Sequence, residues 1–141
     1  MKKKIIIILI ALMLGGGISY YFFTRKYVVD DNELMSVKAF QIGAFTNYDN
    51  ALRVAERNNG IVVSEEEIFR VYVAILSSQD AVDIMRKYYD SIGLNYYLRD
   101  IMVDAKFLDS LKDSEKLLVS SDTEVYKVIN LSVLNMYEEF L

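Results

Sequence analysis

The sequence predicts an α+β domain: a four-stranded antiparallel sheet with two helices on one face, in the βαββαβ order of RNP-like and ferredoxin-like folds. Two observations support this prediction. A strand-like alternation that runs into a capped helix and then a glycine occurs twice, in residues 40–60 and 71–93. The connection between the two halves, residues 64–67, is short enough for a hairpin. A chain of 141 residues fits one such domain with accessory segments.

Residues 1–26 are predicted to be a basic cytoplasmic tip followed by a transmembrane anchor. Three lysines at positions 2–4 precede an uncharged run, residues 5–23, which is long enough to cross a hydrocarbon core of ~30 Å. The positive-inside rule then keeps the N-terminus in the cytoplasm and places the rest of the chain outside. A cleaved signal peptide is the alternative, because residues 15–19 are small enough to be processed, although no A-x-A site follows.

Composition excludes several classes of chemistry. The chain has no Cys and no His, so disulfides, thiol catalysis and imidazole metal sites are absent. Its formal net charge is −4, and no basic stripe suits a nucleic acid. The acidic turn at residues 65–67 lacks the ligand spacing of a calcium loop. No serine has a histidine or Ser-x-x-Lys partner, and the carboxylates fall in turns and caps. We therefore expect a non-enzyme without a cofactor.

The first half of the domain follows a short polar linker, residues 27–36. Residues 37–45 alternate as a half-buried strand, in which Phe40 and Ile42 face the helices and Gln41 faces away. Asn47 is the expected N-cap of the next helix, which Gly60 ends. Residues 60–63 then form the second strand.

The second half repeats this order. In the third strand, residues 68–76, the odd positions from Phe69 to Ile75 are expected in the core, and Arg70 and Tyr72 face away. A serine-rich cap at residues 77–80 opens the second helix, and Gly93 follows its end. In the fourth strand, residues 94–102, Tyr96 and Leu98 are expected inward, whereas Tyr97 and Arg99 point outward.

Residues 105–141 are predicted to be a C-terminal extension of two helices. Residues 107–111 fit the first helix, and a cap candidate at residues 120–122 opens the second. Apolar positions then recur at helical spacing, so this stripe must be buried against another surface. The stripe comprises Val125, Val128, Ile129, Ser132, Val133, Met136 and Phe140.

Residues 37–104 resemble a SPOR domain, the peptidoglycan-binding module of bacterial cell-division and sporulation proteins. The opening strand of that family carries Gln, Gly and an aromatic residue, which here are Gln41, Gly43 and Phe45, followed by the asparagine-alanine pair at 50–51. The arginine-valine start of its third strand corresponds to residues 70–71. Many family members also have an N-terminal membrane anchor.

The resemblance implies a glycan-binding site on the open face of the sheet. Its expected residues are Gln41, Gly43, Ala44, Arg70, Tyr72 and Tyr97. The sequence departs from the family at Ala44, which replaces a small polar residue, and at residues 74–76, which replace a glycine-proline. The main polar and aromatic members also have a structural interpretation. Gln41 can be hydrogen-bonded by a neighbouring strand residue or by the C-terminal tail, and Arg70 can pair with Glu67 or another surface carboxylate. Tyr72 and Tyr97 can be cross-strand partners that stabilise the sheet.

Two functions follow from these observations. The first is a single-pass membrane protein whose extracytoplasmic domain binds peptidoglycan, including denuded glycan strands, together with division or sporulation proteins. The second is a non-catalytic protein–protein adaptor on the same scaffold, with the sheet face covered by the C-terminal helices or by a partner. RNA binding by a similar sheet is disfavoured, because the domain is expected outside the cell and lacks a basic face.

Overall fold

The computed structural model describes residues 33–141. Residues Leu34–Leu141 form one compact unit with its own hydrophobic core. The predicted membrane anchor, residues 5–23, lies outside the described residues. Within the described part of the chain, no helix has the length and apolarity needed to span a membrane.

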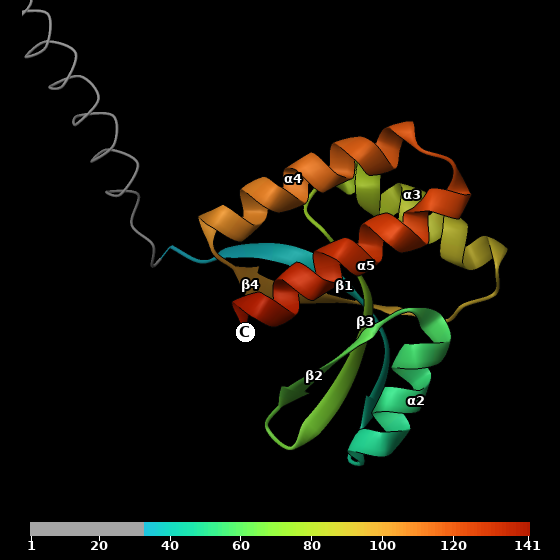
Figure 1. The fold of residues 1–141 in the computed structure, drawn as a ribbon, viewed down its shortest axis with the longest axis vertical. Helices are drawn as coiled ribbons and strands as arrows, with labels where there is room; N and C mark the ends of the chain where they lie inside the picture. Colours follow the sequence, from blue (N-terminus) through green and yellow to red (C-terminus); the bar gives the residue numbers. More distant parts are fainter. Residues whose placement is uncertain (1–32) are drawn as a thin grey trace, which may run out of the picture. The chain divides into compact units, whose positions relative to one another are not determined.

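The unit is an α+β fold built on a four-stranded antiparallel sheet, as predicted (Figure 1). The strands β1 (Met35–Phe45), β2 (Ile61–Glu65), β3 (Ile68–Leu76) and β4 (Tyr97–Val103) lie in the order β2-β3-β1-β4. Helix α2 (Tyr48–Asn58) connects β1 to β2, and α3 (Gln79–Ser91) connects β3 to β4. This order is compatible with a ferredoxin-like arrangement. Two further helices follow, α4 (Ala105–Ser120) and α5 (Thr123–Phe140).

Local sequence signals set the ends of the first two helices. The Asn47 side chain accepts a hydrogen bond from the backbone N–H of Asn50 at 3.1 Å, and Ser78 caps α3 through the N–H of Ala81 at 3.2 Å. These bonds satisfy donors that the first turn of a helix leaves unpaired. Glu66 and Glu67 have φ values of 50° and 67° and form the two-residue turn between β2 and β3. The caps and the hairpin are as predicted.

Strands β1 and β3 are irregular where they pair at their centres. Phe40 is opposite Ala74, Gln41 is opposite Tyr72 and Gly43 is opposite Val71, so one residue on each strand is skipped. Such bulges bend and twist a sheet. Figure 1 shows β1 changing direction between its two halves.

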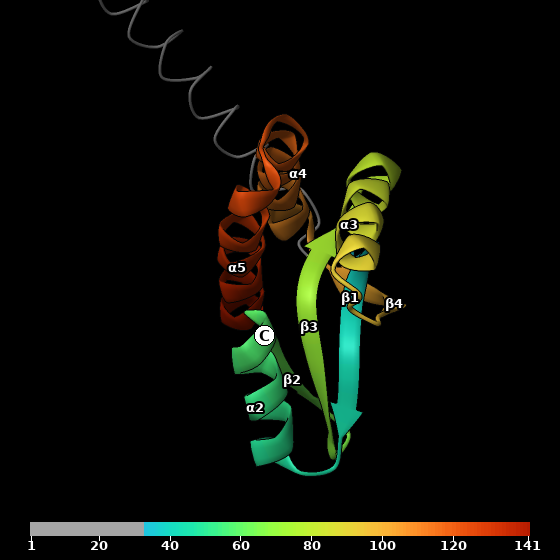
Figure 2. The same ribbon diagram turned by 90° about the vertical axis from the view of Figure 1, so that its right-hand side faces the viewer.

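Helices α2 and α3 pack on different parts of the sheet. Helix α2 lies on the hairpin end through Ala51 and Ala55, which contact Val71, and α3 packs through Met85 against Phe40. Ile42 packs against the α2 cluster and against the α3 cluster. The side chains of β1 that face the two helices therefore lie on one side of the strand, as predicted. Because the strands bend, the two helices appear at different ends of the sheet in Figure 2.

Helices α4 and α5 cover the sheet face that the first interpretation of the sequence expects to be open and that the second expects to be covered. Their side chains form a buried cluster with residues from all four strands. Figure 2 shows α5 running alongside the sheet above α2. The cluster joins Phe107, Leu111, Val133, Leu134 and Tyr137 from the helices to Val37, Ala39, Ile61, Val63, Tyr72, Ile75, Ile101 and Val103 from the strands.

Two expectations about burial are wrong. Ile75 was expected beside Phe69 and Val71, but it lies in the cluster under α4 and α5, because the bulge interrupts the alternation along β3. In the last helix, three members of the expected stripe are exposed, and the stripe that packs inward is rotated around the helix to include Leu134 and Tyr137. The exposed members are Val125, Val128 and Ser132.

Candidate binding surface

The six predicted site residues lie close together on β1, β3 and β4. Gln41 is opposite Tyr72 on one side and Tyr97 on the other, and Ala44 is opposite Arg70. Arg70 Nη1 donates a hydrogen bond to Gln41 Oε1 at 3.3 Å. The structure therefore assembles the neighbourhood that the sequence pattern predicts.

Tyr72 is not an open stacking platform, which corrects the expectation for this residue. It is only 1% exposed, and its ring centroid lies 6.5 Å from that of Tyr137 on α5. Burial raises the pKa of Tyr72, against an opposing effect of the nearby Arg99 guanidinium. Burial also raises the pKa of Tyr137. A sugar ring cannot reach the Tyr72 face while α5 is in place.

Gly43 has a packing role on the side of the sheet that α2 covers. An ideal Cβ at this position would lie 2.5 Å from Phe45 Cε2, so the glycine provides room for the aromatic ring that follows it. Phe45 itself packs with the α2 cluster. The Gln-Gly-aromatic spacing thus has a packing explanation in this chain.

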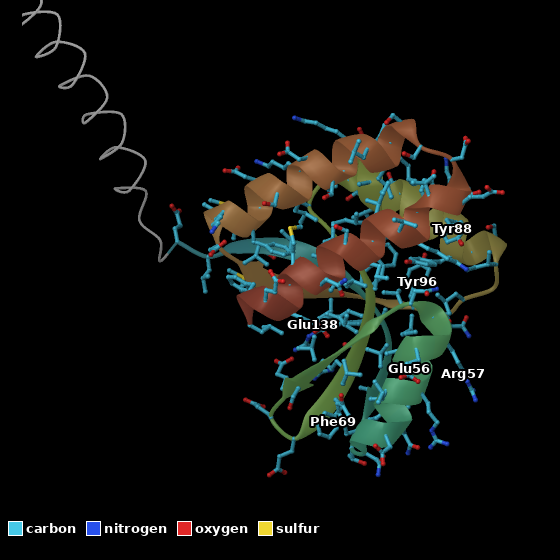
Figure 3. All side chains as sticks on the ribbon, in the orientation of Figure 1. Glu56, Arg57, Phe69, Tyr88, Tyr96 and Glu138 are labelled. Carbon is cyan, nitrogen blue, oxygen red and sulfur yellow. The ribbon has the colours of Figure 1, made fainter. Side chains whose placement is uncertain are left out.

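Ala44 and Tyr97 remain accessible. The side chain of Ala44 is exposed beside Arg70, and Tyr97 is 65% exposed. Tyr96 and Leu98, in contrast, pack with Phe40 and its neighbours, so the predicted alternation of β4 is confirmed. The Tyr96 ring centroid lies 4.9 Å from that of Phe40, and Figure 3 shows Tyr96 away from the hairpin end of the sheet. Tyr97 is the aromatic side chain of the predicted set that can still offer its face to a ligand.

A network of two arginines and one glutamate extends this surface. Arg70 Nε lies 3.1 Å from Glu65 Oε2, and Arg99 Nη2 lies 3.0 and 3.1 Å from the two Glu65 oxygens. Arg70 is therefore paired with a surface carboxylate, as one interpretation of the sequence expects, and that carboxylate is Glu65. Glu65 links the hairpin end of β2 to β4, the strand at the other edge of the sheet.

A pocket of about 290 Å³ opens next to this network under the last turns of α5. Its polar lining includes Arg99, Glu65 and the two tyrosines Tyr72 and Tyr137. Apolar walls come from both sheet edges and from the residue that follows α5, namely Val63, Ile101, Met102 and Leu141. We call Gln41, Glu65, Arg70, Arg99 and this pocket the arginine strip.

Sequence reasoning placed Arg99 on the outward side of β4 but did not include it or Glu65 in the site. The alternation of β4 was the available signal, since it points Arg99 to the same face as Tyr97. Glu65 gave no comparable signal, because an acidic hairpin is ordinarily a solvated turn. Among residues 33–141, no group of three or more acidic side chains is arranged to hold a metal ion.

Known proteins provide no further guide to the class of this protein. No family model matches the chain, and neither the curated proteins nor the solved structures contain a significantly similar one. The class of the protein is therefore given by its fold alone, which is an α+β fold with an antiparallel sheet and helices packed on both faces.

Proposed function

We propose that this protein is a non-catalytic binding module whose partner is another protein. The proposal is carried by the burial of Tyr72 under α5, which occupies the sheet face that a SPOR-like glycan site would need. The resemblance in residues 37–104 then concerns the scaffold more than its ligand. The N-terminal segment would anchor the module to the membrane, with residues 34–141 on the extracytoplasmic side.

The free energy gained by packing α4 and α5 on the sheet argues against the idea that these helices form a lid that opens to admit glycan. Five fully or almost fully buried side chains hold α4 and α5 on the sheet: Phe107, Leu111, Val133, Leu134 and Tyr137. Burial of a large apolar side chain contributes about 1.5–3 kcal/mol, so these five account for roughly 7–15 kcal/mol as an upper estimate. A whole domain is stable by only about 5–15 kcal/mol. Detaching the two helices would therefore unfold the unit.

The outer side of α4 and α5 supports binding to a protein. Within residues 33–141, eleven large apolar side chains are exposed, and five of them lie on these two helices. This concentration favours an apolar contact there over scattered surface exposure. The five are Leu117, Val119, Val125, Val128 and Leu131. Val125, Val128 and Leu131 recur every three residues and therefore share one side of α5, which we call the outer helix patch.

Site-specific photo-crosslinking of the full chain in its native cells tests the proposal. A photoreactive residue at Val128, which is 68% exposed, should give one discrete adduct with a protein, whereas the same residue at the exposed Asp83 of α3 should not. The matched loss variant is Leu131→Glu in the same patch, which should remove the Val128 adduct without changing the unfolding midpoint. Adducts of equal yield at Val128 and Asp83 would contradict the proposal.

Glycan binding is the second candidate, because Gln41, Arg70 and the exposed Tyr97 still lie together on neighbouring strands. It predicts that residues 34–141 co-sediment with denuded glycan strands more than an unrelated domain of similar charge does. Tyr97→Ala and Gln41→Glu should both reduce this retention. Retention that is strong and sensitive to both variants would favour the glycan candidate over the protein partner.

A further inference from the structure

The arginine strip holds a carboxylate that belongs to the chain itself. Glu65 is the last residue of β2, and its side chain is 45% exposed at the hairpin end of the sheet. Two guanidiniums from β3 and β4 converge on it, with Arg70 and Arg99 only 18% and 29% exposed. The two guanidiniums are thus more buried than the carboxylate between them, and Glu65 is the group that solvent reaches most easily.

The contact of Glu65 with the arginines is weak enough to be replaced. Ion pairs between solvent-exposed side chains contribute about 0–1 kcal/mol, because solvent screens them and ordering two long side chains costs entropy. Glu65 is 45% exposed, so solvent reaches its carboxylate and screens this contact as well. A carboxylate from a ligand can form the same paired hydrogen bonds to a guanidinium. Glu65 therefore shows which chemical group fits between Arg70 and Arg99.

The neighbouring groups favour a ligand that accepts hydrogen bonds. Arg70 Nη1 donates to Gln41 Oε1, so the amide nitrogen of Gln41 is the group left to donate. Guanidiniums have donors only. Asp100, the other carboxylate at the pocket, is paired with Lys38. If Glu65 moves aside, the arginine strip offers donors and two positive charges.

The pocket next to Arg99 sets the size of the rest of the ligand. Its volume of about 290 Å³ lies at the lower end of the range for ligand sites, which is roughly 300–1,000 Å³. Val63 and Ile101 supply apolar walls, and Tyr72 and Tyr137 border it from the sheet and from α5. A space of this size accepts one or two small residues but not a glycan chain.

We propose that Arg70 and Arg99 bind the terminal carboxylate of a peptide whose last, small apolar residue enters this pocket, and that Glu65 occupies the site when the peptide is absent. This inference rests on the proposed function, because it specifies which part of a partner protein the module recognises, namely its terminal carboxylate. It is separate from the outer helix patch.

The test is a titration of residues 34–141, followed by NMR, with N-acetyl-trialanine as the free acid and as the C-terminal amide. We expect the acid to shift the resonances of β4 and of the Arg99 side chain, and the amide to shift neither. Glu65→Gln should tighten acid binding at least about fivefold, since it removes the competing carboxylate. Arg99→Gln should weaken it at least about tenfold, whereas Lys87→Gln, which removes an exposed positive charge on α3, should leave it unchanged.

Two versions of the acid separate the sources of the carboxylate. Preference for a terminal L-alanine indicates a protein C-terminus, and preference for D-alanine indicates a wall stem peptide. Equal binding of acid and amide, or acid binding that Glu65→Gln does not tighten, would overturn the inference. Absence of acid binding in every variant would also overturn it, while the Val128 crosslinking result would still decide the proposed function independently.

Discussion

Glu115 on α4 offers a direct test of whether the C-terminal helices are integral to the fold. Its carboxylate is 5% exposed and accepts hydrogen bonds from the backbone N–H and the hydroxyl of Ser77 and from the backbone N–H of Ser78, the last at 3.0 Å. Ser78 is the N-cap of α3. The carboxylate therefore joins α4 to the positive end of α3 and to the turn after β3.

We expect Glu115→Ala to destabilise residues 34–141 by roughly 2–4 kcal/mol. The substitution leaves two backbone N–H groups at a partly buried site without a protein acceptor, and each such group costs about 1–3 kcal/mol, less where water can reach it. Glu115→Gln should cost only about 1–2 kcal/mol, because the amide oxygen still accepts from the N–H groups and its nitrogen can donate to the Ser77 hydroxyl. A charged acceptor makes a hydrogen bond roughly twice as strong as a neutral one does, and the Gln variant loses this contribution.

Urea unfolding, followed by far-UV circular dichroism, measures these differences, with the m-value reporting whether the folded state stays intact. Asp113→Ala is the matched control on the same helix, since the Asp113 side chain is 80% exposed and should contribute less than about 0.5 kcal/mol. If Glu115→Ala falls within about 1 kcal/mol of the parent, then α4 is not fixed through this carboxylate and the reasoning fails.

Three further predictions concern single residues. Burial raises the pKa of Tyr89 in the folded state. The neutral phenol therefore stabilises the fold fully below the unfolded pKa of about 10, and this stabilisation is lost as the pH rises above that pKa. Tyr89→Phe should flatten the fall in the urea midpoint between roughly pH 9 and pH 11. Asn47→Ala should cost about 1 kcal/mol by removing the cap of α2, and a Ser at this position should restore most of it on thermal unfolding. Gly60→Ala should destabilise the fold by more than about 1 kcal/mol, because its Cβ would lie 2.7 Å from the carbonyl oxygen of Tyr72. Gly93→Ala has free space around its Cβ and should cost only about 1 kcal/mol, through the φ of 71° at this position. Equal unfolding midpoints for the two variants would contradict this account.

The sequence predicts the elements and their order well, because those depend on neighbouring residues. Asn47 and Ser78 cap the expected helices, and the alternation of Tyr96, Tyr97 and Leu98 gives the correct sides of β4. These signals are local: a cap acts within one turn of a helix, and a strand repeats every two residues. The four-stranded sheet follows from them.

Features that depend on distant residues were not predictable in the same way. The bulge that moves Ile75 to the other cluster depends on how β3 pairs with β1, and no residue within β3 indicates it. The apolar stripe of the last helix shows that it must pack somewhere, but not on which face. Its rotation toward Leu134 and Tyr137 is set by the surface it meets. For the same reason, the site residues were found in part, and a sheet face covered by the C-terminal helices was only one of two alternatives that the sequence left open.

The packing of α5 against the sheet has a consequence for synthesis. The strands are complete once residue 103 has been made, but Tyr72, Ile75 and Ile101 stay uncovered until residues 133–137 have left the ribosome. Cooperative folding must therefore wait for the final segment of translation. A chain stalled before that segment would expose the apolar face of its sheet. We expect chaperones and proteases to bind or degrade such incomplete copies through this exposed surface.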